Sequence, residues 1–281
     1  MKRRYAGITL IEILMVAGII IILAGLLIPA TTMVRKSAKV TKQRVELNSI
    51  ELGITAFRND YGDYPPSDYD TTPNGYGGAQ KLTEALCGWD LLGFHPNSHW
   101  RADGRDNAGN RVYDANTINP ANLRARKGPY LDMTAVSVYK INQLFQNYSP
   151  LQGDTYVLCD VFGVRNLQPG KALAGTPVLY YRANRASRDP NITATLADRI
   201  YNYEDNRDLV ALRTLTPDGS ASGRSHRLGL VTGNYQNFYD FIADNRGAIP
   251  WCYNSESYIL ITAGPDGEYG TKDDICNFPT P

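Results

Sequence analysis

One apolar run near the N-terminus constrains this chain more than any other feature. The run extends from Ile8 to Ala30, roughly 23 residues, and Glu12 is its only charged member, whereas a helix needs about 20 apolar residues to cross a hydrocarbon core. Lys2, Arg3 and Arg4 precede it, and basic residues on that side favour a cytoplasmic N-terminus. The sequence therefore predicts a single-pass inner-membrane protein whose polar remainder lies in the periplasm.

The run differs from an ordinary cleaved signal peptide. It is too long for the usual apolar region of such a peptide, and no small-residue cleavage site follows it. The small-residue junction lies before it, at Gly7, so cleavage there would leave the apolar helix on the mature protein. A carboxylate inside a membrane segment is costly and needs a partner. The new α-amine of Ile8 on a neighbouring copy would supply one for Glu12.

The residues at this junction read Gly7-Ile8-Thr9-Leu10-Ile11-Glu12. This stretch resembles the class III leader of type IV prepilins and type II secretion pseudopilins. The resemblance implies that prepilin peptidase cuts after Gly7 and methylates Ile8, although the family usually has phenylalanine at that position. It also implies that Glu12 neutralises the N-terminus of an adjoining subunit during assembly, and that Pro29 kinks the helix. The plain alternative is a signal anchor with an isolated glutamate.

Composition and patterning divide the chain into four parts. We expect a leader at 1–7, a transmembrane and assembly helix at 8–30, an amphipathic continuation at 31–62 and an exported globular head at 63–281. The net charge of +1 argues against nucleic-acid binding. Four cysteines allow three disulfide pairings, and disulfides and buried free thiols both stay open.

Periodicity predicts the elements of the head. The amphipathic helix should bury the side chains of Val34, Ala38, Val45, Ile50, Ile54 and Phe57 and end near Tyr61, before Gly62 and Pro65-Pro66. Short helices are expected at 80–92, 134–148 and 237–245, and strands at 156–160, 178–182 and 258–262.

Three stretches of the head carry the resemblance further. They read Asn59-Asp60-Tyr61-Gly62-Asp63-Tyr64-Pro65, Asp160-Val161-Phe162-Gly163 with Pro177-Val178-Leu179-Tyr180-Tyr181, and the closing segment from Ser257 to Ile275. They are similar to segments of major pseudopilins. The resemblance implies an α+β, pilin-like fold, in which a long N-terminal helix packs on a small antiparallel sheet with long loops.

The closing segment also contains the best candidate site. Carboxylates and backbone carbonyls in a glycine-bent loop, 266–274, are what Ca²⁺ prefers. The residues that would hold the ion are Asp266, Asp273 and Asp274. The equivalent loop of major pseudopilins binds calcium, and the alternative is a solvated acidic turn. Zinc at His95 and His99 is disfavoured because no third ligand is evident.

The pattern favours a structural protein over an enzyme, because no catalytic constellation is evident. The resemblance implies a filament subunit of a type IV pilus or type II secretion pseudopilus, whose partners are further copies, other pilin-like subunits, prepilin peptidase and an inner-membrane assembly platform. A minor pilin or adhesin-like binding module, displayed from the inner membrane or a filament tip, is the alternative. An anchored exported enzyme is a third, weaker hypothesis.

Overall fold

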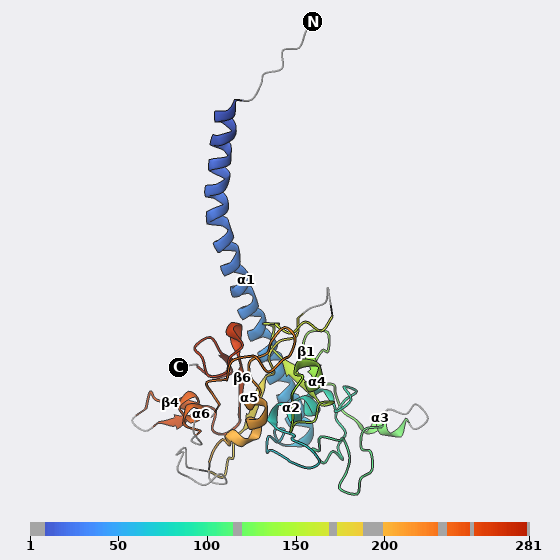
Figure 1. Cartoon of the computed structure of the whole chain (residues 1–281). Helices are drawn as coiled ribbons and strands as arrows, with labels where there is room; N and C mark the ends of the chain where they lie inside the picture. The colour runs from blue at the N-terminus through green and yellow to red at the C-terminus, as the bar shows by residue number, and fades with distance from the viewer. Residues whose placement is uncertain are drawn as a thin grey trace. The chain divides into compact units, whose positions relative to one another are not determined.

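A computed structural model describes residues 9–114, 120–168, 173–187, 199–229, 235–247 and 250–279, except for the side chains at positions 26, 29 and 30 of the first helix. The chain divides into two compact units, Met1–Thr41 and Lys42–Pro281. Figure 1 traces the helices and strands in chain order. The two units are described separately.

Helix α1, Leu10–Tyr61, contributes residues to both units. It begins after Thr9, whose hydroxyl accepts a hydrogen bond from the backbone N–H of Glu12 at 3.3 Å. It ends where Gly62 adopts a φ of +84° and donates its N–H to the carbonyl of Arg58 at 2.7 Å, a termination that glycine allows because it has no Cβ. The predicted end near Tyr61 is confirmed. Position 29 lies within α1, and the kink at Pro29 stays a prediction.

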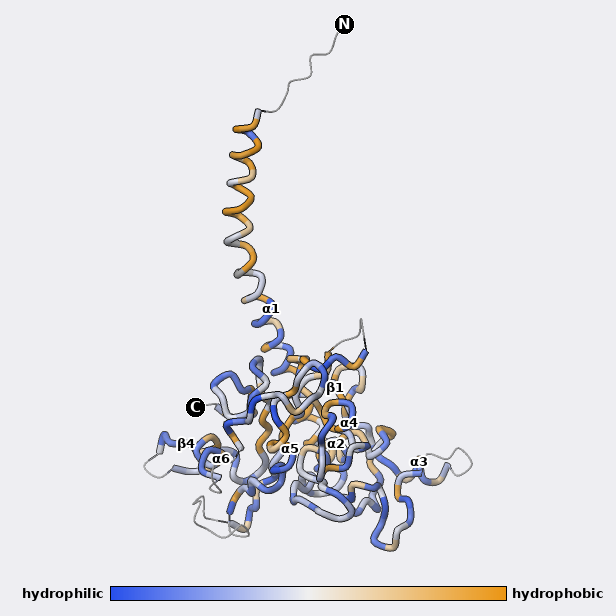
Figure 2. Tube along the Cα trace, viewed as in Figure 1, coloured by the Kyte–Doolittle hydropathy of each residue, from blue (hydrophilic) through white to orange (hydrophobic). Residues whose placement is uncertain are grey.

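The first unit presents apolar side chains to solvent along α1. Figure 2 shows this part of the helix largely in the hydrophobic colour. The exposed side chains range from 52% accessible at Ile19 to 76% at Leu10. They include Ile11, Ile13, Leu14, Met15, Val16, Ile20, Ile21, Ile22, Leu23, Leu27, Ile28, Met33 and Val34.

The structure contradicts the predicted inner-membrane anchor. Among the described residues, no helix combines the length and the apolar character that a membrane crossing requires. A hydrocarbon core needs about 20 apolar residues. The described residues therefore do not support the predicted single-pass topology.

In the second unit, one face of α1 is buried in the head. Leu47, Ile50, Ile54 and Phe57 are each at most 3% exposed, and their spacing of three or four residues places them on one side of a helix. Val34, Ala38 and Val45, which were expected on this face, are exposed, Val34 at 68% and Val45 at 58%. Leu47 occupies the buried face instead, because it lies three residues before Ile50.

The strands of the described residues form three small antiparallel sheets. Strands β1 (Ser137–Lys140) and β2 (Tyr156–Cys159) make one sheet. Strands β3 (Leu179–Arg182), β6 (Tyr258–Thr262) and β7 (Ile275–Cys276) make the second, in the order β3-β6-β7. Strands β4 (Ala243–Asp244) and β5 (Trp251–Cys252) make the third. The predicted strands at 156–160, 178–182 and 258–262 are confirmed as β2, β3 and β6.

The predicted pilin-like fold class, a long membrane and head helix packed on one small sheet, is contradicted. The helix that packs most extensively on strands is α2 (Gly78–Cys87), which contacts β2 and β3. Every residue of α2 is buried. The strands form three separate sheets, one of three strands and two of two, and the short α2 lies against strands of two of these sheets.

The remaining elements are short. Residues 134–148, predicted as a helix, contain β1 followed by the single turn α4 (Ile141–Leu144). Val138 and Tyr139 pair with Leu158 and Val157 across the β1–β2 ladder, and β-branched and aromatic residues suit such cross-strand packing. The other helical segments are α3 (Ala121–Ala125), η2 (Tyr203–Asn206), α5 (Arg207–Ala211), α6 (Gln236–Phe241) and η3 (Gly264–Asp266); α6 confirms the helix expected at 237–245, although it is shorter.

The thiols of the head are not joined. Cys87, Cys159, Cys252 and Cys276 all lie in the described residues, and each is a free cysteine. The first three are buried. Of the two alternatives left open by the sequence, the structure has the free thiols.

Candidate metal site

The candidate site lies in the connection between β6 and β7. These strands pair Ile261 with Cys276 and Thr262 with Ile275, so the residues after Thr262 and before Ile275 form the loop of one hairpin. The two ends of that loop approach closely at Gly264, which has a φ of +60°. A Cβ at this position would lie 2.1 Å from the carbonyl oxygen of Asp273. Glycine is therefore required to close the loop.

The loop brings together the three predicted carboxylates. One oxygen each of Asp266, Asp273 and Asp274 lies within 4.8 Å of the others. Asp266 is exposed, Asp273 is partly buried and Asp274 is 4% exposed. The cluster thus runs from the surface into the head.

Hydrogen bonds inside the loop orient these carboxylates. Asp274 accepts from the N–H of Gly270 at 2.7 Å and from the hydroxyl of Thr271 at 3.2 Å. The same hydroxyl lies 2.6 Å from Asp273, which also accepts from the N–H of Asp266 at 3.2 Å. Asp266 in turn accepts from the N–H of Glu268 at 2.8 Å. Each carboxylate is held by at least one bond from the loop itself.

The crowded acids have perturbed proton affinities. Burial raises the pKa of Asp274 to about 7, opposed by its bonds from Gly270 and Thr271 and assisted by the negative charge of Asp266. Burial also raises the pKa of Asp266, and the charge of Asp273 adds to this effect. Like charges that share a site disfavour ionisation, so a cation bound among them would relieve the repulsion.

The donor set fits Ca²⁺. Calcium takes carboxylate, carbonyl and hydroxyl oxygens at about 2.3–2.6 Å, so two ligands on opposite sides of one ion lie about 5 Å apart. The separation of at most 4.8 Å between the three carboxylates falls within this limit. The three residues would hold the ion, and the hydroxyl of Thr271 lies beside two of them.

A second layer of contacts supports the loop, and the sequence analysis missed it. Glu268 is 5% exposed and pairs with Arg227 at 3.0 Å and with Arg224 at 3.5 Å. The N–H of Tyr269 donates to Nδ1 of His226 at 3.1 Å. Burial lowers the pKa of His226 to about 4, which keeps the ring neutral and able to accept this bond. No local pattern connects residues 224–227 to the loop, because about 40 residues separate them.

The N-terminal candidates are only partly described. Gly7 and Ile8, the predicted cleavage and methylation residues, lie outside the described residues. Glu12 lies in the first turn of α1, where its carboxylate accepts from the N–H of Thr9 at 2.8 Å and from the Thr9 hydroxyl at 2.9 Å. Together with the reciprocal bond to the Thr9 hydroxyl, this is a capping box. The pattern Thr-x-x-Glu before an apolar run would have revealed it.

The two histidines considered for zinc form hydrogen-bonding contacts within their own loop. His95 is 7% exposed, and its Nδ1 accepts from the N–H of Asn97 at 3.2 Å. His99 is exposed, and its Nδ1 lies 3.1 Å from the carbonyl of Asn97. Within the described part of the chain, the only grouping of three potential metal-ligating side chains is the aspartate cluster.

Comparison with protein-family models, curated proteins and solved structures found no match for this chain.

Proposed function

We propose that this chain is a filament subunit of the type IV pilus or type II secretion pseudopilus kind, assembled through α1. The observation that carries the proposal is the row of exposed apolar side chains from Leu10 to Val34. An apolar surface of this extent on a single chain marks a site of association. Burial of these side chains between neighbouring helices would supply the driving force, at about 25 cal/mol for each Å² removed from water.

Further copies of the chain, or other pilin-like subunits, are the proposed partners. A helix that carries the same apolar surface can bury it against an equivalent helix, since the exposed residues of the first unit offer few charges before Arg35. The basic residues that follow, Arg35, Lys36 and Lys39, are exposed and would stay outside the apolar contact. Assembly would use prepilin peptidase and an inner-membrane assembly platform.

Processing of the N-terminus is the first step to test. The protein would be purified from cells that contain prepilin peptidase and from matched cells that lack it, and its intact mass and N-terminal sequence would be determined. We expect a chain that starts at Ile8 and is heavier by one methyl group only in the first case. Retention of residues 1–7 in both would contradict the proposal, and a Gly7→Leu variant provides the uncleavable control.

We further propose that Asp266, Asp273 and Asp274 bind Ca²⁺ and thereby stabilise the β6–β7 loop. Support comes from the 4.8 Å limit on the separation of their oxygens and from the burial of Asp274. The ion would act on the head, where Asp274 lines a pocket together with residues from the 44–51 stretch of α1, rather than on the exposed apolar side chains of the first unit. Loss of calcium is therefore expected to lower the stability of the subunit before it affects contacts between subunits.

A further inference from the structure

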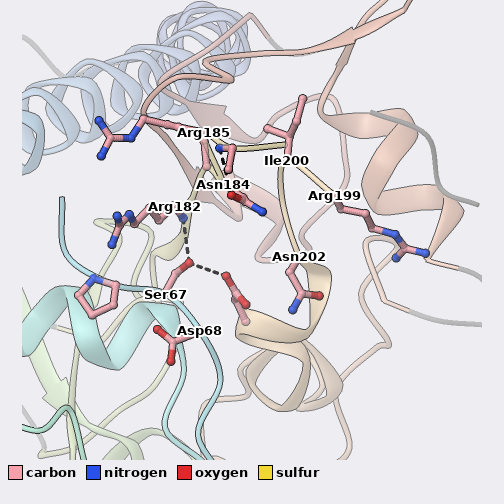
Figure 3. A pocket seen from close by; sticks show the side chains of 12 residues that line it. Ser67, Asp68, Arg182, Asn184, Arg185, Arg199, Ile200 and Asn202 are labelled. Carbon is pink, nitrogen blue, oxygen red and sulfur yellow. Dashed lines mark hydrogen bonds between the residues drawn. The ribbon is translucent and has the colours of Figure 1, made fainter. Parts of the chain in front are cut away.

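A polar pocket lies on the head, away from the aspartate cluster. Its volume is about 440 Å³, within the roughly 300–1,000 Å³ typical of small-molecule sites. Three segments line it: residues 66–68 after α1, residues 182–186 at the end of β3, and a segment that contributes Arg199, Ile200 and Asn202 before η2 and Asp205 within it. Figure 3 shows the side chains that these segments contribute.

The rim of the pocket carries a surplus of positive charge. Arg182 and Arg185 both pair with one carboxylate, that of Asp63, at 2.5 and 2.9 Å. Figure 3 shows the two guanidinium groups on the same side of the pocket, whereas Arg199 extends to the other side, where it contacts the hydroxyl of Tyr239 at 3.0 Å. Among the described residues, these two cations share one anion, so the group carries one positive charge more than the Asp63 carboxylate balances. Each guanidinium has five N–H donors, and Asp63 uses few of them.

The floor of the pocket is polar and well ordered. Ser67 and Asp205 are each 4% exposed, and the Ser67 hydroxyl donates to the Asp205 carboxyl. The Ser67 oxygen accepts from the backbone N–H of Arg182 at 2.9 Å, which connects the floor to the rim. Burial raises the pKa of Asp205 to about 7, so near neutral pH its carboxyl group can donate as well as accept. The half-buried amide of Asn202 adds a further polar group.

We propose that this pocket binds a small sugar acid, a molecule with one carboxylate and neighbouring hydroxyl groups. The carboxylate would lie against the guanidinium groups of Arg182 and Arg185, whose planar donors match its geometry. The hydroxyl groups would meet Asn202 and the carboxylate of Asp68, which is largely exposed at the edge. A single negative charge matches the excess that Arg182 and Arg185 have over Asp63 among the described residues, whereas the second charge of a phosphate dianion would face Asp63 and Asp68. The inference is independent of filament assembly.

Binding of D-glucuronate to the full chain, measured by isothermal titration calorimetry, tests the proposal. We expect saturable binding of one molecule per chain. Arg185→Ala should weaken it by about tenfold or more, because a charge-assisted bond is lost. The Arg185 side chain is 43% exposed, so this variant should fold. Arg124→Ala, which removes an exposed charge from α3 instead, is the matched control and should bind as the unsubstituted chain does.

A second variant tests the proposal in the opposite direction. Asp63→Asn removes the anion that competes for both arginines, so it should tighten D-glucuronate binding severalfold. D-glucose, which lacks the carboxylate, should not bind measurably. The proposal is overturned by the absence of saturable binding, by equal binding of glucose, by an unchanged affinity in Arg185→Ala or by weaker binding in Asp63→Asn.

Discussion

The carboxylate of Glu12 accepts two hydrogen bonds from Thr9, one from the backbone N–H at 2.8 Å and one from the hydroxyl at 2.9 Å. The bond from the backbone N–H has the larger effect, and both bonds lower the pKa of Glu12. In the single chain the charge therefore already has a structural role, since it completes the first turn of α1. A role in assembly must be separated from this capping role by experiment.

Glu12→Gln separates the two roles. Glutamine still caps a helix from this position, but it has no charge to neutralise a neighbouring N-terminus. If the proposed assembly contact is correct, Glu12→Gln should retain its helix content by circular dichroism and lose most filament formation, as seen by electron microscopy. Thr9→Val, which removes the capping hydroxyl and keeps the charge, is the matched control and should still assemble. Normal filaments from Glu12→Gln would assign the residue to capping alone.

Calcium should stabilise the head through the aspartate cluster. Addition of Ca²⁺ to about a hundredfold excess over its dissociation constant should raise the free energy of unfolding by about 2.7 kcal/mol. Asp273→Asn should remove most of this gain, because it deletes one of three converging charges. Thermal unfolding with Ca²⁺ and with a chelator measures the effect. Asp132→Asn, an exposed aspartate of another loop, is the control; equal calcium responses in both variants would argue against the site.

The buried Asp274 should make stability depend on pH when calcium is absent. Its pKa is about 7 in the folded chain against a reference value of 3.8, so the folded state holds the proton more tightly than the unfolded state does. The stability that this group contributes is full below the unfolded value and falls as the pH rises toward about 7. Relative to Asp274→Asn, the unsubstituted chain should lose stability between about pH 4 and about pH 7.

Urea unfolding of both proteins in a chelator checks this pH dependence. Asp205 and His226 also titrate abnormally, but both proteins contain them, so their effects cancel in the difference. A difference that stays constant with pH, or that rises with it, would contradict the assignment of a raised pKa to the buried Asp274 carboxyl group.

Glu84 should be a main source of stability in the loops that follow α2. This carboxylate is 2% exposed and accepts from the hydroxyls of Tyr76, Ser98 and Tyr113 at 2.6, 2.5 and 2.7 Å. Tyr113→Phe removes one donor from a buried carboxyl group and should lower the free energy of unfolding by about 1–3 kcal/mol. Tyr148→Phe, a partly buried tyrosine outside this cluster, should change it by less than about 0.5 kcal/mol. Equal losses in the two variants would contradict the assignment.

Gly264→Ala should open the β6–β7 loop. The new Cβ would lie 2.1 Å from the Asp273 carbonyl oxygen, and φ is +60°. Gly109→Ala is a matched control, because Gly109 has a φ of +86° and nothing within 4 Å of an added Cβ. The control should lose about 1 kcal/mol from backbone strain alone, and Gly264→Ala clearly more, together with its calcium response. Similar losses would mean that the loop accommodates the methyl group.

The elements that sequence predicted well are those whose signal is local. The end of α1 follows from Gly62 and the prolines after it, and β2, β3 and β6 follow from short apolar runs. The meeting of Asp266 with Asp273 and Asp274 was predictable because one glycine-bent loop contains all three. The pairing of β1 with β2 was missed because residues 134–148 also suit a helix, and only the partner strand decides between the two.

The contacts that sequence failed to predict depend on chain segments far apart. α2, and not α1, is the helix that contacts the strands most extensively, and these contacts join segments that are far apart in the sequence. Glu268 is neutralised by Arg227, and the floor of the polar pocket joins Ser67 to Asp205 across 138 residues. Periodicity carries no information on such pairs.

The capping box at the start of α1 has a consequence for the proposed cleavage after Gly7. Thr9 and Glu12 satisfy each other, so the first turn needs nothing from the residues before Ile8 to be complete. Removal of the seven leading residues would therefore change the charge and chemistry of the chain's new end while leaving the helix intact. The proposed cleavage after Gly7 would therefore leave the hydrogen bonds between Thr9 and Glu12 in place.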